Sequence, residues 1–405
     1  MNIVAIGGGT GLPVVLKGLK KYLYPRDRQH HSNKLTAIVT VADDGGSSGR
    51  LRRDLDILPP GDIRNCLVAL ADTDSILPDL FQYRFTKSPE LNSHSMGNLL
   101  LAALSELTHD FQYAIQTTGR LLGIHGRVLP STLERVELGA KLKDRRIIWG
   151  ETAITKNGNG IEIEKVFLRP ENPSPVPLAL EAIASADAII LGPGSLYTSL
   201  IPNLLIRGIV EAISESSAKK ICVMNLMTQP GETDGYTAED HLDAIFKHCG
   251  RPIFDYVILN AKKFEGGPLK EYRTKGSMPV DYNLRRIIKQ GTICPIEEHV
   301  ASETTKIRHD PDKLAQTILN VIRKKHGRTR AKGLRFSGDK TSNLQPQTPN
   351  VQPPPRSVAT LGRIPLNKDL SKQCSNCLWF EWSSTKKICV NRGTRVCPIL
   401  HRKLF

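Results

Sequence analysis

The chain opens with a short apolar run, NIVAI, that leads directly into a cluster of glycines. An amphipathic stretch begins immediately after four glycines, which are Gly7, Gly8, Gly9 and Gly11. A strand, a tight glycine turn and a helix in this order let a phosphate approach backbone N–H groups at the positive end of the helix. The spacing matches neither the G-x-G-x-x-G dinucleotide fingerprint, because position 12 is leucine, nor a Walker A loop. The sequence therefore predicts a phosphate-bearing ligand but leaves its identity open.

Residues 1–322 alternate between short apolar strands and amphipathic helices. The strands are β-branched and apolar on both faces, which is typical of parallel strands covered by helices on both sides. We expect strands at 2–6, 36–41, 188–191, 220–224 and 256–259, and helices at 12–23, 62–71, 96–107, 177–185, 206–214, 238–248 and 311–325. Residues 133–167 alternate differently and predict a small antiparallel β insertion with a tight turn at 157–160. The predicted fold class is α/β, with a Rossmann-like, mostly parallel sheet, helices on both faces, this insertion, and a C-terminal cysteine-rich metal-binding extension.

Polar, glycine-bearing loops follow four of the predicted strands. Besides the first turn, they contain Asp43 and Asp44, then Gly194 and Ser195, then Asn225. Ligands of open parallel sheets bind beyond the carboxyl ends of the strands, so the four loops together predict one crevice. The paired acids suit either a ribose hydroxyl or a Mg²⁺ ion that bridges phosphates. The alternative is that they only stabilise a turn.

Other polar residues are explained about equally well by a role in local structure and by a role in ligand binding. Asp62 follows Pro-Pro-Gly and is a good N-cap for a helix, although Arg64 and Asn65 in the next turn could reach the crevice. Four cysteines in apolar surroundings are expected to be buried, reduced thiols: Cys66, Cys222, Cys249 and Cys294. The sequence nominates no nucleophile or general base.

The positive charge of the chain is concentrated at its C-terminal end. The formal net charge is +16, and the segment from Arg323 onward holds 18 Lys and Arg against 3 Asp and Glu, which leaves a net charge of +1 for residues 1–322. Any contact with nucleic acid or anionic lipid is therefore predicted for the tail alone. No apolar run approaches the ~20 residues that span a bilayer, and no signal peptide is recognisable, so we expect a cytoplasmic location.

Taken together, the loop sequences resemble one family. The matching runs are IVAIGGGTGL, AIVTVADDGGSSGRLR, LPPGDIRNCLVALAD, HSMGNLLLAAL, LGPGSLYTSLIPNLL and NLMTQPGETDGYTAEDH. They are similar to the gluconeogenesis-factor (YvcK-like) family, which lies within the CofD-like superfamily founded on 2-phospho-L-lactate transferase. The resemblance covers about residues 1–325, and several of the motifs are long enough to be specific.

The resemblance implies a cytoplasmic protein that binds a UDP-sugar, notably UDP-N-acetylglucosamine. It implies a role in cell morphogenesis and envelope synthesis during gluconeogenic growth, with partners in cell-wall synthesis, and we also expect a homo-oligomer. The residues to which it assigns ligand contacts are Gly8, Gly9, Thr10, Gly11, Asp43, Asp44, Asn98, Gly194, Ser195, Tyr197, Asn225 and Arg308. Arg308 is expected to meet the diphosphate, because its guanidinium presents a fork of donors.

A CofD-like transferase is the alternative function. In that branch Asp43 and Asp44 would hold Mg²⁺ while a phospholactyl-type group passes from a nucleotide diphosphate donor to a deazaflavin hydroxyl. The chain carries the gluconeogenesis-factor versions of these loops, so we rank binding and regulation above transfer chemistry.

The tail departs from the family. We predict a domain at 1–325, a basic, Pro-rich flexible linker at 326–371 and a four-cysteine module at 372–405. Its cysteines are spaced C-x2-C-x11-C-x7-C, which suits a tetrahedral Zn²⁺ site, with a [4Fe–4S] cluster as the alternative and a disulfide less expected: Cys374, Cys377, Cys389 and Cys397. Aromatic residues at 379, 380 and 382 could pack around the metal or stack on bases. A tail-mediated nucleic-acid or partner adaptor is therefore a further alternative.

Overall fold

The computed structural model describes residues 1–25, 33–72, 74–87, 91–156, 160–290, 293–303 and 306–324, together with the backbone of 380–382 and 387–389. The chain divides into two compact units, Met1–Thr329 and Arg330–Phe405. The finer division at residues 325 and 371 stays a prediction. In the second unit, β13 (Phe380–Trp382) pairs antiparallel with β14 (Lys387–Cys389).

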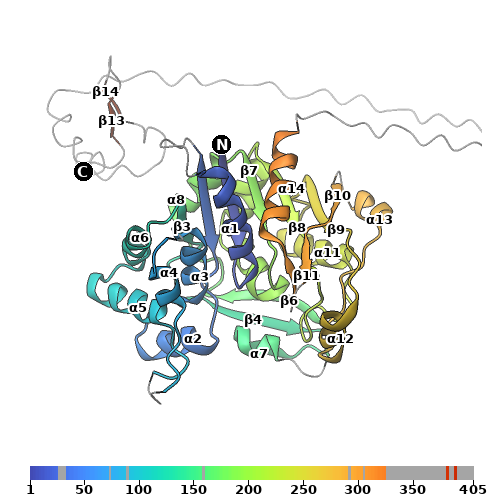
Figure 1. Cartoon of the computed structure of the whole chain (residues 1–405), viewed down its shortest axis with the longest axis horizontal. Helices are drawn as coiled ribbons and strands as arrows, with labels where there is room; N and C mark the ends of the chain where they lie inside the picture. The colour runs from blue at the N-terminus through green and yellow to red at the C-terminus, as the bar shows by residue number, and fades with distance from the viewer. Residues whose placement is uncertain are drawn as a thin grey trace, which may run out of the picture. The chain divides into compact units, whose positions relative to one another are not determined.

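A seven-stranded parallel sheet forms the centre of the first unit (Figure 1). Its order is β10-β9-β8-β7-β1-β2-β3. The strands are β1 (Asn2–Gly7), β2 (Lys34–Val39), β3 (Arg127–Pro130), β7 (Ala188–Leu191), β8 (Lys219–Val223), β9 (Tyr256–Asn260) and β10 (Cys294–Glu298). β1 pairs with β2 on one side and with β7 on the other. The chain therefore builds the sheet outward in both directions from the β1–β7 pair.

The α/β fold class and the five predicted strands are confirmed to within two residues at each end. The two strands that the sequence did not reveal, β3 and β10, lie at the two edges of the sheet. Their sequences, RVLP and CPIEE, contain proline and charged residues. Such residues are tolerated at edges, where one side of the strand makes no ladder hydrogen bonds.

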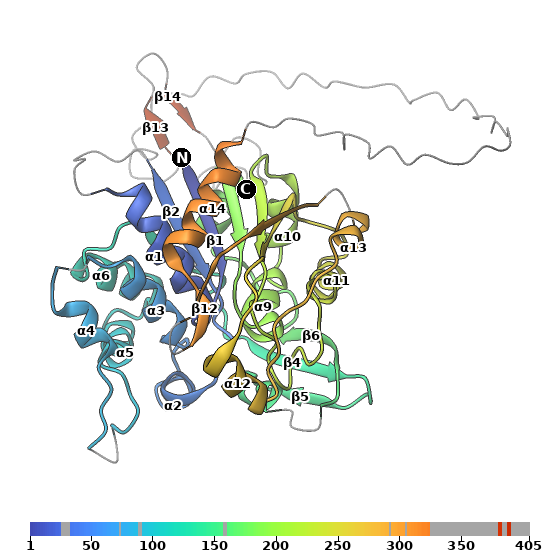
Figure 2. The same cartoon turned by 45° about the vertical axis from the view of Figure 1, so that its right-hand side comes forward.

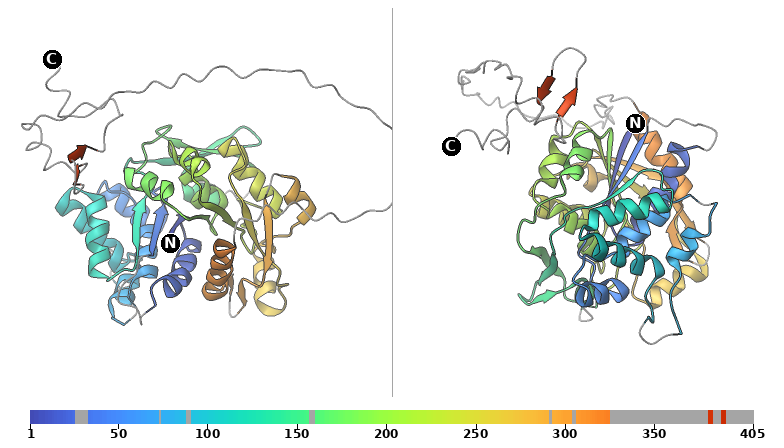
Figure 3. Two further views of the ribbon diagram at one scale, coloured as in Figure 1. Left: turned by 90° about the horizontal axis from the view of Figure 1, so that it is seen from above. Right: turned by 90° about the vertical axis from the view of Figure 1, so that its left-hand side faces the viewer.

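Helices cover both faces of the sheet. α1 packs against α3 and α14, and Figure 3 shows α1 and α14 side by side, with α8 and α10 on the opposite side of the sheet. The helices are α1 (Gly11–Leu23), α2 (Gly46–Asp54), α3 (Gly61–Leu70), α4 (Leu77–Gln82), α5 (Met96–Thr108), α6 (Phe111–Leu121), α7 (Glu151–Thr155), α8 (Pro177–Ala184), α9 (Ile201–Leu204), α10 (Ile209–Glu215), α11 (Ala238–Cys249), α12 (Gly266–Thr274), α13 (Leu284–Lys289) and α14 (Pro311–Arg323). A π-helical turn at Leu196–Leu200 precedes α9.

Local side-chain contacts explain where several helices begin and end. The Ser95 hydroxyl accepts the Asn98 N–H at the start of α5, and Thr237 with Asp240 forms a capping box at the start of α11. α14 begins at Pro311, after the cap residue Asp310. The buried Lys219 Nζ donates to three carbonyl groups at the end of α14, so that β8 and α14 are joined.

A three-stranded antiparallel sheet confirms the predicted insertion. It contains β4 (Glu137–Leu142), β5 (Ile147–Trp149) and β6 (Ile163–Arg169), in the order β5-β4-β6. Of the predicted turn at 157–160, residues 157–159 lie outside the described residues. β5 and β6 both pair with β4, and α7 lies between them along the chain. The side-chain alternation indicated the strands but could not indicate which strand lay in the middle.

The predicted environment of the cysteines was correct only in part. Cys66 and Cys222 are buried, whereas Cys249 is half-buried and Cys294 is exposed on the edge strand β10. Among the described residues, no single helix is long and apolar enough to cross a membrane. The segments Leu196–Leu204 and Ile209–Glu215 are long and apolar enough only when they are taken together, and the chain bends by 74° between them.

Candidate functional site

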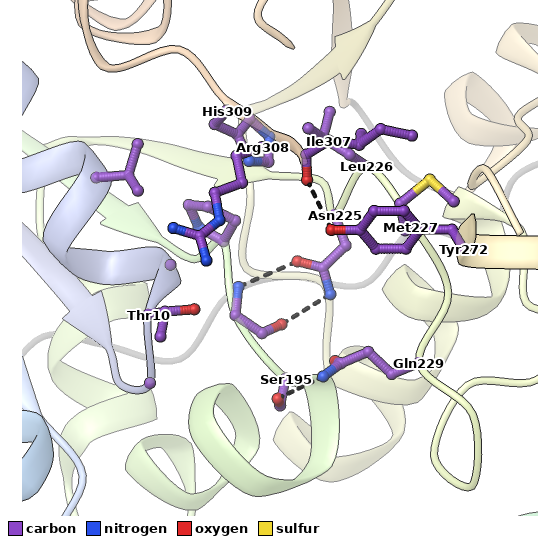
Figure 4. Close-up of a pocket in the computed structure, with 15 residues that line it drawn as sticks. Thr10, Ser195, Asn225, Leu226, Met227, Gln229, Tyr272, Ile307, Arg308 and His309 are labelled. Atoms are coloured by element: carbon purple, nitrogen blue, oxygen red, sulfur yellow. Dashed lines mark hydrogen bonds between the residues drawn. The ribbon is translucent and has the colours of Figure 1, made fainter. Parts of the chain in front are cut away.

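A cavity opens where the order of the parallel strands reverses. β1 leads into the glycine turn and β7 leads into residues 192–195, and these loops are neighbours because β1 and β7 are paired. The cavity has a volume of about 230 Å³ (Figure 4). It is lined by Gly9, Thr10, Gly11, Val14, Pro193, Gly194, Ser195, Asn225, Leu226, Met227, Gln229, Tyr272, Ile307, Arg308 and His309. Ligands of open α/β sheets bind at such a switch point.

The glycine turn is shaped by close approach as well as by backbone conformation. Gly9 has φ +61°, which favours glycine, and a Cβ on Gly11 would overlap the carbonyl oxygen of Pro193. The turn therefore places the start of α1 directly against the loop after β7. The first N–H groups of α1 have no acceptor within the helix, so they can donate to an anion in the cavity.

Asn225 holds the loop after β7 in place. Its Oδ1 accepts the Gly194 N–H at 3.0 Å, and its Nδ2 donates to the Gly194 carbonyl oxygen at 2.7 Å. Gln229, from the same segment, donates to the Ser195 hydroxyl at 2.7 Å. Both contacts are drawn in Figure 4. Asn225 thus lines the cavity, and both polar atoms of its amide group bond to Gly194.

Arg308 reaches the cavity from a short strand that is fixed on both sides. β12 (Ile307–His309) pairs with β11 (Ala301–Glu303). The Ile307 carbonyl accepts the Tyr272 hydroxyl at 3.3 Å, and the buried His309 Nε2 lies 3.2 Å from the Met224 carbonyl oxygen. Burial lowers the pKa of His309 to about 4, so its ring is neutral at physiological pH. Figure 4 shows the Arg308 guanidinium extended toward Thr10.

Four carboxyl groups gather behind the glycine turn. The Asp62 Oδ2 accepts the Gly9 N–H at 2.7 Å, and the charges of Asp43, Asp62 and Glu232 all act on the carboxyl group of Glu151. Burial raises the pKa of Glu151 to about 9, with Asp43 adding to the rise, and burial raises that of Glu232 to about 7. Burial also raises the pKa of Asp62 to about 7, again with Asp43 contributing. These carboxyl groups therefore keep their protons up to a higher pH than exposed carboxyl groups do.

The expected cap role of Asp62 was wrong. α3 begins at Gly61 after Pro60, and no side chain caps it. Asp62 instead bonds to Gly9, because the loop after β1 passes beside the first turn of α3. Arg64 also turns away from the crevice. It is buried and donates to the side chains of Ser95 and Asn98.

The paired acids have structural partners. Asp43 accepts the Gly45 N–H at 2.8 Å, which is the turn role considered as the alternative. Asp44 accepts the Thr152 N–H at 2.8 Å and the Thr152 hydroxyl at 2.7 Å, so it joins the α2 segment to α7. The segment that follows these acids is the helix α2 rather than a loop that wraps a ligand.

The prediction of bound metals was wrong for the part of the chain that the structure describes. There, no three His, Cys, Asp or Glu side chains gather as a set that could hold a metal ion. The Mg²⁺ site expected at Asp43 and Asp44 is therefore corrected, because both carboxylates serve the contacts given above. Of the tail cysteines expected to bind Zn²⁺ or an iron–sulfur cluster, Cys374, Cys377 and Cys397 lie outside the described residues, and only the backbone of Cys389 is described, in β14.

The structure brings some of the predicted ligand residues together and leaves others apart. Gly9, Thr10, Gly11, Gly194, Ser195, Asn225 and Arg308 line the cavity. Gly8 lies behind the turn, where a Cβ would stand 2.7 Å from Asp62 Oδ2. Asn98 is buried and donates to the Ser47 hydroxyl at 3.0 Å. Tyr197 is buried too, and its hydroxyl lies 2.9 Å from that of Tyr236, beside a different cavity.

Sequence reasoning missed the apolar and aromatic part of the lining. Tyr272 lies on α12, a helix that the apolar periodicity did not reveal, and Met227 and Gln229 lie in the loop after β8. Met227 and Gln229 belong to a polar segment that was predicted to face the ligand as a whole. No pattern in the sequence pointed to Tyr272, because its place depends on how α12 folds back over β12.

The fold and the cavity define an α/β protein of the Rossmann-like type, with a phosphate-compatible turn at its switch point. A family model described as 2-phospho-L-lactate transferase CofD matches residues 3–301, and the chain belongs to this family. The resemblance seen in the loop motifs is thereby confirmed.

Relatives named as gluconeogenesis factors match most of the chain. The protein of Halalkalibacterium halodurans is 45% identical over 320 residues, which cover 78% of this chain and 95% of the relative. The protein of Bacillus subtilis is 42% identical over 322 residues, which cover 80% and 98%. A crystal structure of a protein from Bacillus halodurans aligns with a TM-score of 0.74 at 44% identity and covers 78% of this chain and 99% of that one.

Proposed function

We propose that the chain binds a nucleotide sugar of the UDP-N-acetylglucosamine type at the switch-point cavity. The observation that carries this proposal is the meeting of three groups at one cavity: the free start of α1 at Thr10 and Gly11, the hydroxyl of Ser195, and the guanidinium of Arg308. Helix N-termini and guanidinium groups are the two protein features that best bind phosphate oxygens.

The other wall of the cavity suits the nucleoside. Met227, Tyr272 and Ile307 give it an apolar surface against which a flat base can lie. The diphosphate would lie between the turn and Arg308, which places the sugar beyond Arg308. The relatives' name points to gluconeogenic growth. In line with the resemblance of the loop motifs, we further propose that the chain is a cytoplasmic regulator of envelope synthesis and cell shape that responds to the bound sugar nucleotide. Partners in cell-wall synthesis and self-association belong to the same proposal.

Calorimetric titration of the full chain with UDP-N-acetylglucosamine tests the binding site. Arg308→Ala should weaken binding by about ten- to a hundredfold, because charge-assisted hydrogen bonds contribute about 1.5–3 kcal/mol. Arg308→Lys should recover only part of the loss, since an ammonium group lacks the fork. Arg285→Ala, at an exposed arginine of α13, is the matched control. Absence of binding, or equal affinities of Arg308→Ala and the unmodified chain, would refute the proposal.

A transferase is kept as the second candidate because of the proton-holding carboxyl groups beside the turn. A carboxyl group with a raised pKa can exchange a proton with a reacting hydroxyl near neutral pH. Asp62 and Glu232, both with a pKa of about 7, are the groups suited to that work. Transfer from a nucleotide diphosphate donor to a deazaflavin hydroxyl, followed by product detection, tests this function. Product that disappears in Asp62→Asn would raise it above simple binding.

A further inference from the structure

A second, larger cavity adjoins the nucleotide cavity. Its volume is about 710 Å³, and it lies between α1, α3, α4 and the β11–β12 hairpin. Figure 2 shows β12 beside α1 and α3. The two cavities share Thr10, Val14, Arg308 and His309, so Arg308 stands on the wall common to both. The two cavities therefore adjoin each other at Arg308.

The second cavity is lined by several cationic side chains. Lys17 and Lys20 line it from α1, and Lys306 and Arg308 line it from the hairpin. Residues 1–322 carry a net charge of only +1, so four cations at one cavity are a local concentration. Within the described part of the chain, the side chains of Lys17, Lys306 and Arg308 make no hydrogen bond and no ion pair. Lys20 Nζ donates to the Ala71 carbonyl at 2.5 Å.

The like charges on α1 have no relief from their own helix. Lys17 and Lys20 are spaced i, i+3, where equal charges repel, and the sequence of α1, GLPVVLKGLKKYL, contains no acid. The neighbouring Lys21 is different, because its Nζ lies 2.8 Å from Asp312 outside the cavity.

The carboxylates near the cavity do not neutralise it. Asp310 is the cap residue of α14 and already accepts the N–H groups of Asp312 and Lys313. Asp79 is exposed on α4. Glu271 feels the charge of Lys306, but its own ion pair is with Lys275, at 2.6 Å. Lys17, Lys306 and Arg308 therefore leave the cavity positive against the two acids that line it, Asp79 and Asp310.

The sizes of the two cavities point in the same direction. At about 230 Å³ the first cavity lies below the roughly 300–1,000 Å³ of most ligand sites, so a nucleotide sugar cannot lie wholly within it. Lys17 lies seven residues after Thr10, which is about 10 Å along α1. A group beyond the diphosphate would therefore reach the end of the lysine side chain.

We propose that the second cavity is an anion subsite, where Lys17, Lys306 and Arg308 bind a phosphate or carboxylate group next to the nucleotide. The group is either the acidic substituent of the sugar itself or part of a separate small phosphorylated molecule. The proposal rests on the proposed function for the occupant of the first cavity. Because Arg308 faces both cavities, the two occupants change each other's affinity by the same factor.

Titration of inorganic pyrophosphate into the full chain, saturated with UDP-N-acetylglucosamine, tests for a separate molecule. Binding is expected, and Lys17→Ala and Lys306→Ala should each weaken it about tenfold, since a charged hydrogen bond of about 1.5 kcal/mol corresponds to that factor. Lys313→Ala, at an exposed lysine of α14 outside the cavity, should leave the affinity unchanged.

Comparison of UDP-glucuronic acid with UDP-N-acetylglucosamine tests whether the sugar itself supplies the anionic group. If the sugar supplies the anion, the carboxylate sugar binds at least about tenfold tighter, and Lys17→Ala abolishes that advantage. The subsite is overturned if pyrophosphate does not bind the saturated chain and the carboxylate gives no advantage. It is also overturned if Lys313→Ala weakens binding as much as Lys17→Ala. If UDP-N-acetylglucosamine does not bind at all, the proposed function fails, and titration of pyrophosphate into the unliganded chain with the same variants still decides the subsite.

Discussion

Replacement of Asp62 by asparagine tests the physical state of the carboxyl cluster. The pKa of Asp62 rises from the ordinary 3.8 to about 7, first because of burial and then because of Asp43. An acid whose pKa is higher in the folded chain binds its proton more tightly there than after unfolding. Stability is therefore lost as the pH rises from about 4 to about 7. Asparagine keeps an oxygen for the Gly9 N–H but carries no charge.

The size of the effect follows from the shift. Roughly three pH units at about 1.4 kcal/mol each give an upper limit of about 4 kcal/mol. Between about pH 5 and about pH 8, the unmodified chain should lose about 2–3 kcal/mol relative to Asp62→Asn. Urea unfolding at the two pH values, followed by circular dichroism, measures this difference. Asp54→Asn, at an exposed acid of α2, is the matched control.

The result that would refute the reasoning is an equal pH dependence of unfolding in Asp62→Asn and the unmodified chain. That outcome would mean that Asp62 is well solvated or paired in solution. The idea that this carboxyl can exchange protons near neutral pH would fall with it.

Three other substitutions test the contacts that build the site and the fold. Gly11→Ala puts a Cβ onto the Pro193 carbonyl, which costs about 1–3 kcal/mol of strain. It should therefore weaken UDP-N-acetylglucosamine binding at least about tenfold in calorimetry. Unchanged affinity would show that the glycine turn can shift to make room for the methyl group. Asn225→Ala removes both bonds to Gly194 and should lower the free energy of unfolding by about 1–3 kcal/mol; an unchanged urea midpoint would contradict the clamp. Lys219→Met leaves three carbonyls at the end of α14 without their donor and should lower the melting temperature, whereas an equal or higher melting temperature would show that packing alone holds α14.

The central strands and their parallel direction could be predicted from sequence because each strand is short, apolar and followed by a polar loop, whereas the strand order was not predicted. The carboxyl ends of parallel strands lie at one edge of a sheet, so the loops after β1, β7 and β8 could be assigned to one crevice, whereas Asp43 and Asp44 do not line it. Edge strands and short helices did not carry this signal. α12 is only nine residues long and mixes polar with apolar residues, so the spacing of apolar residues could not reveal the helix that carries Tyr272.

The roles of polar residues were harder to predict than their location. Asn98 and Asp44 occur in motifs rich in glycine and hydroxyl groups, which suit ligands and internal networks equally well. Asn98 bonds to Arg64 and Ser47, and Asp44 bonds to Thr152, 108 residues further along the chain. Such partners are set by tertiary packing, so spacing in the sequence cannot reveal them. Contact of the basic tail with nucleic acid stays a prediction.

The most direct test of the account is a crystal structure of the full chain with UDP-N-acetylglucosamine bound. We predict the diphosphate between the start of α1 at Gly11 and the Arg308 guanidinium, the uracil against Tyr272, and the sugar on the side of Lys17. A nucleotide bound elsewhere on the protein, or a diphosphate that contacts neither α1 nor Arg308, would contradict the central claim.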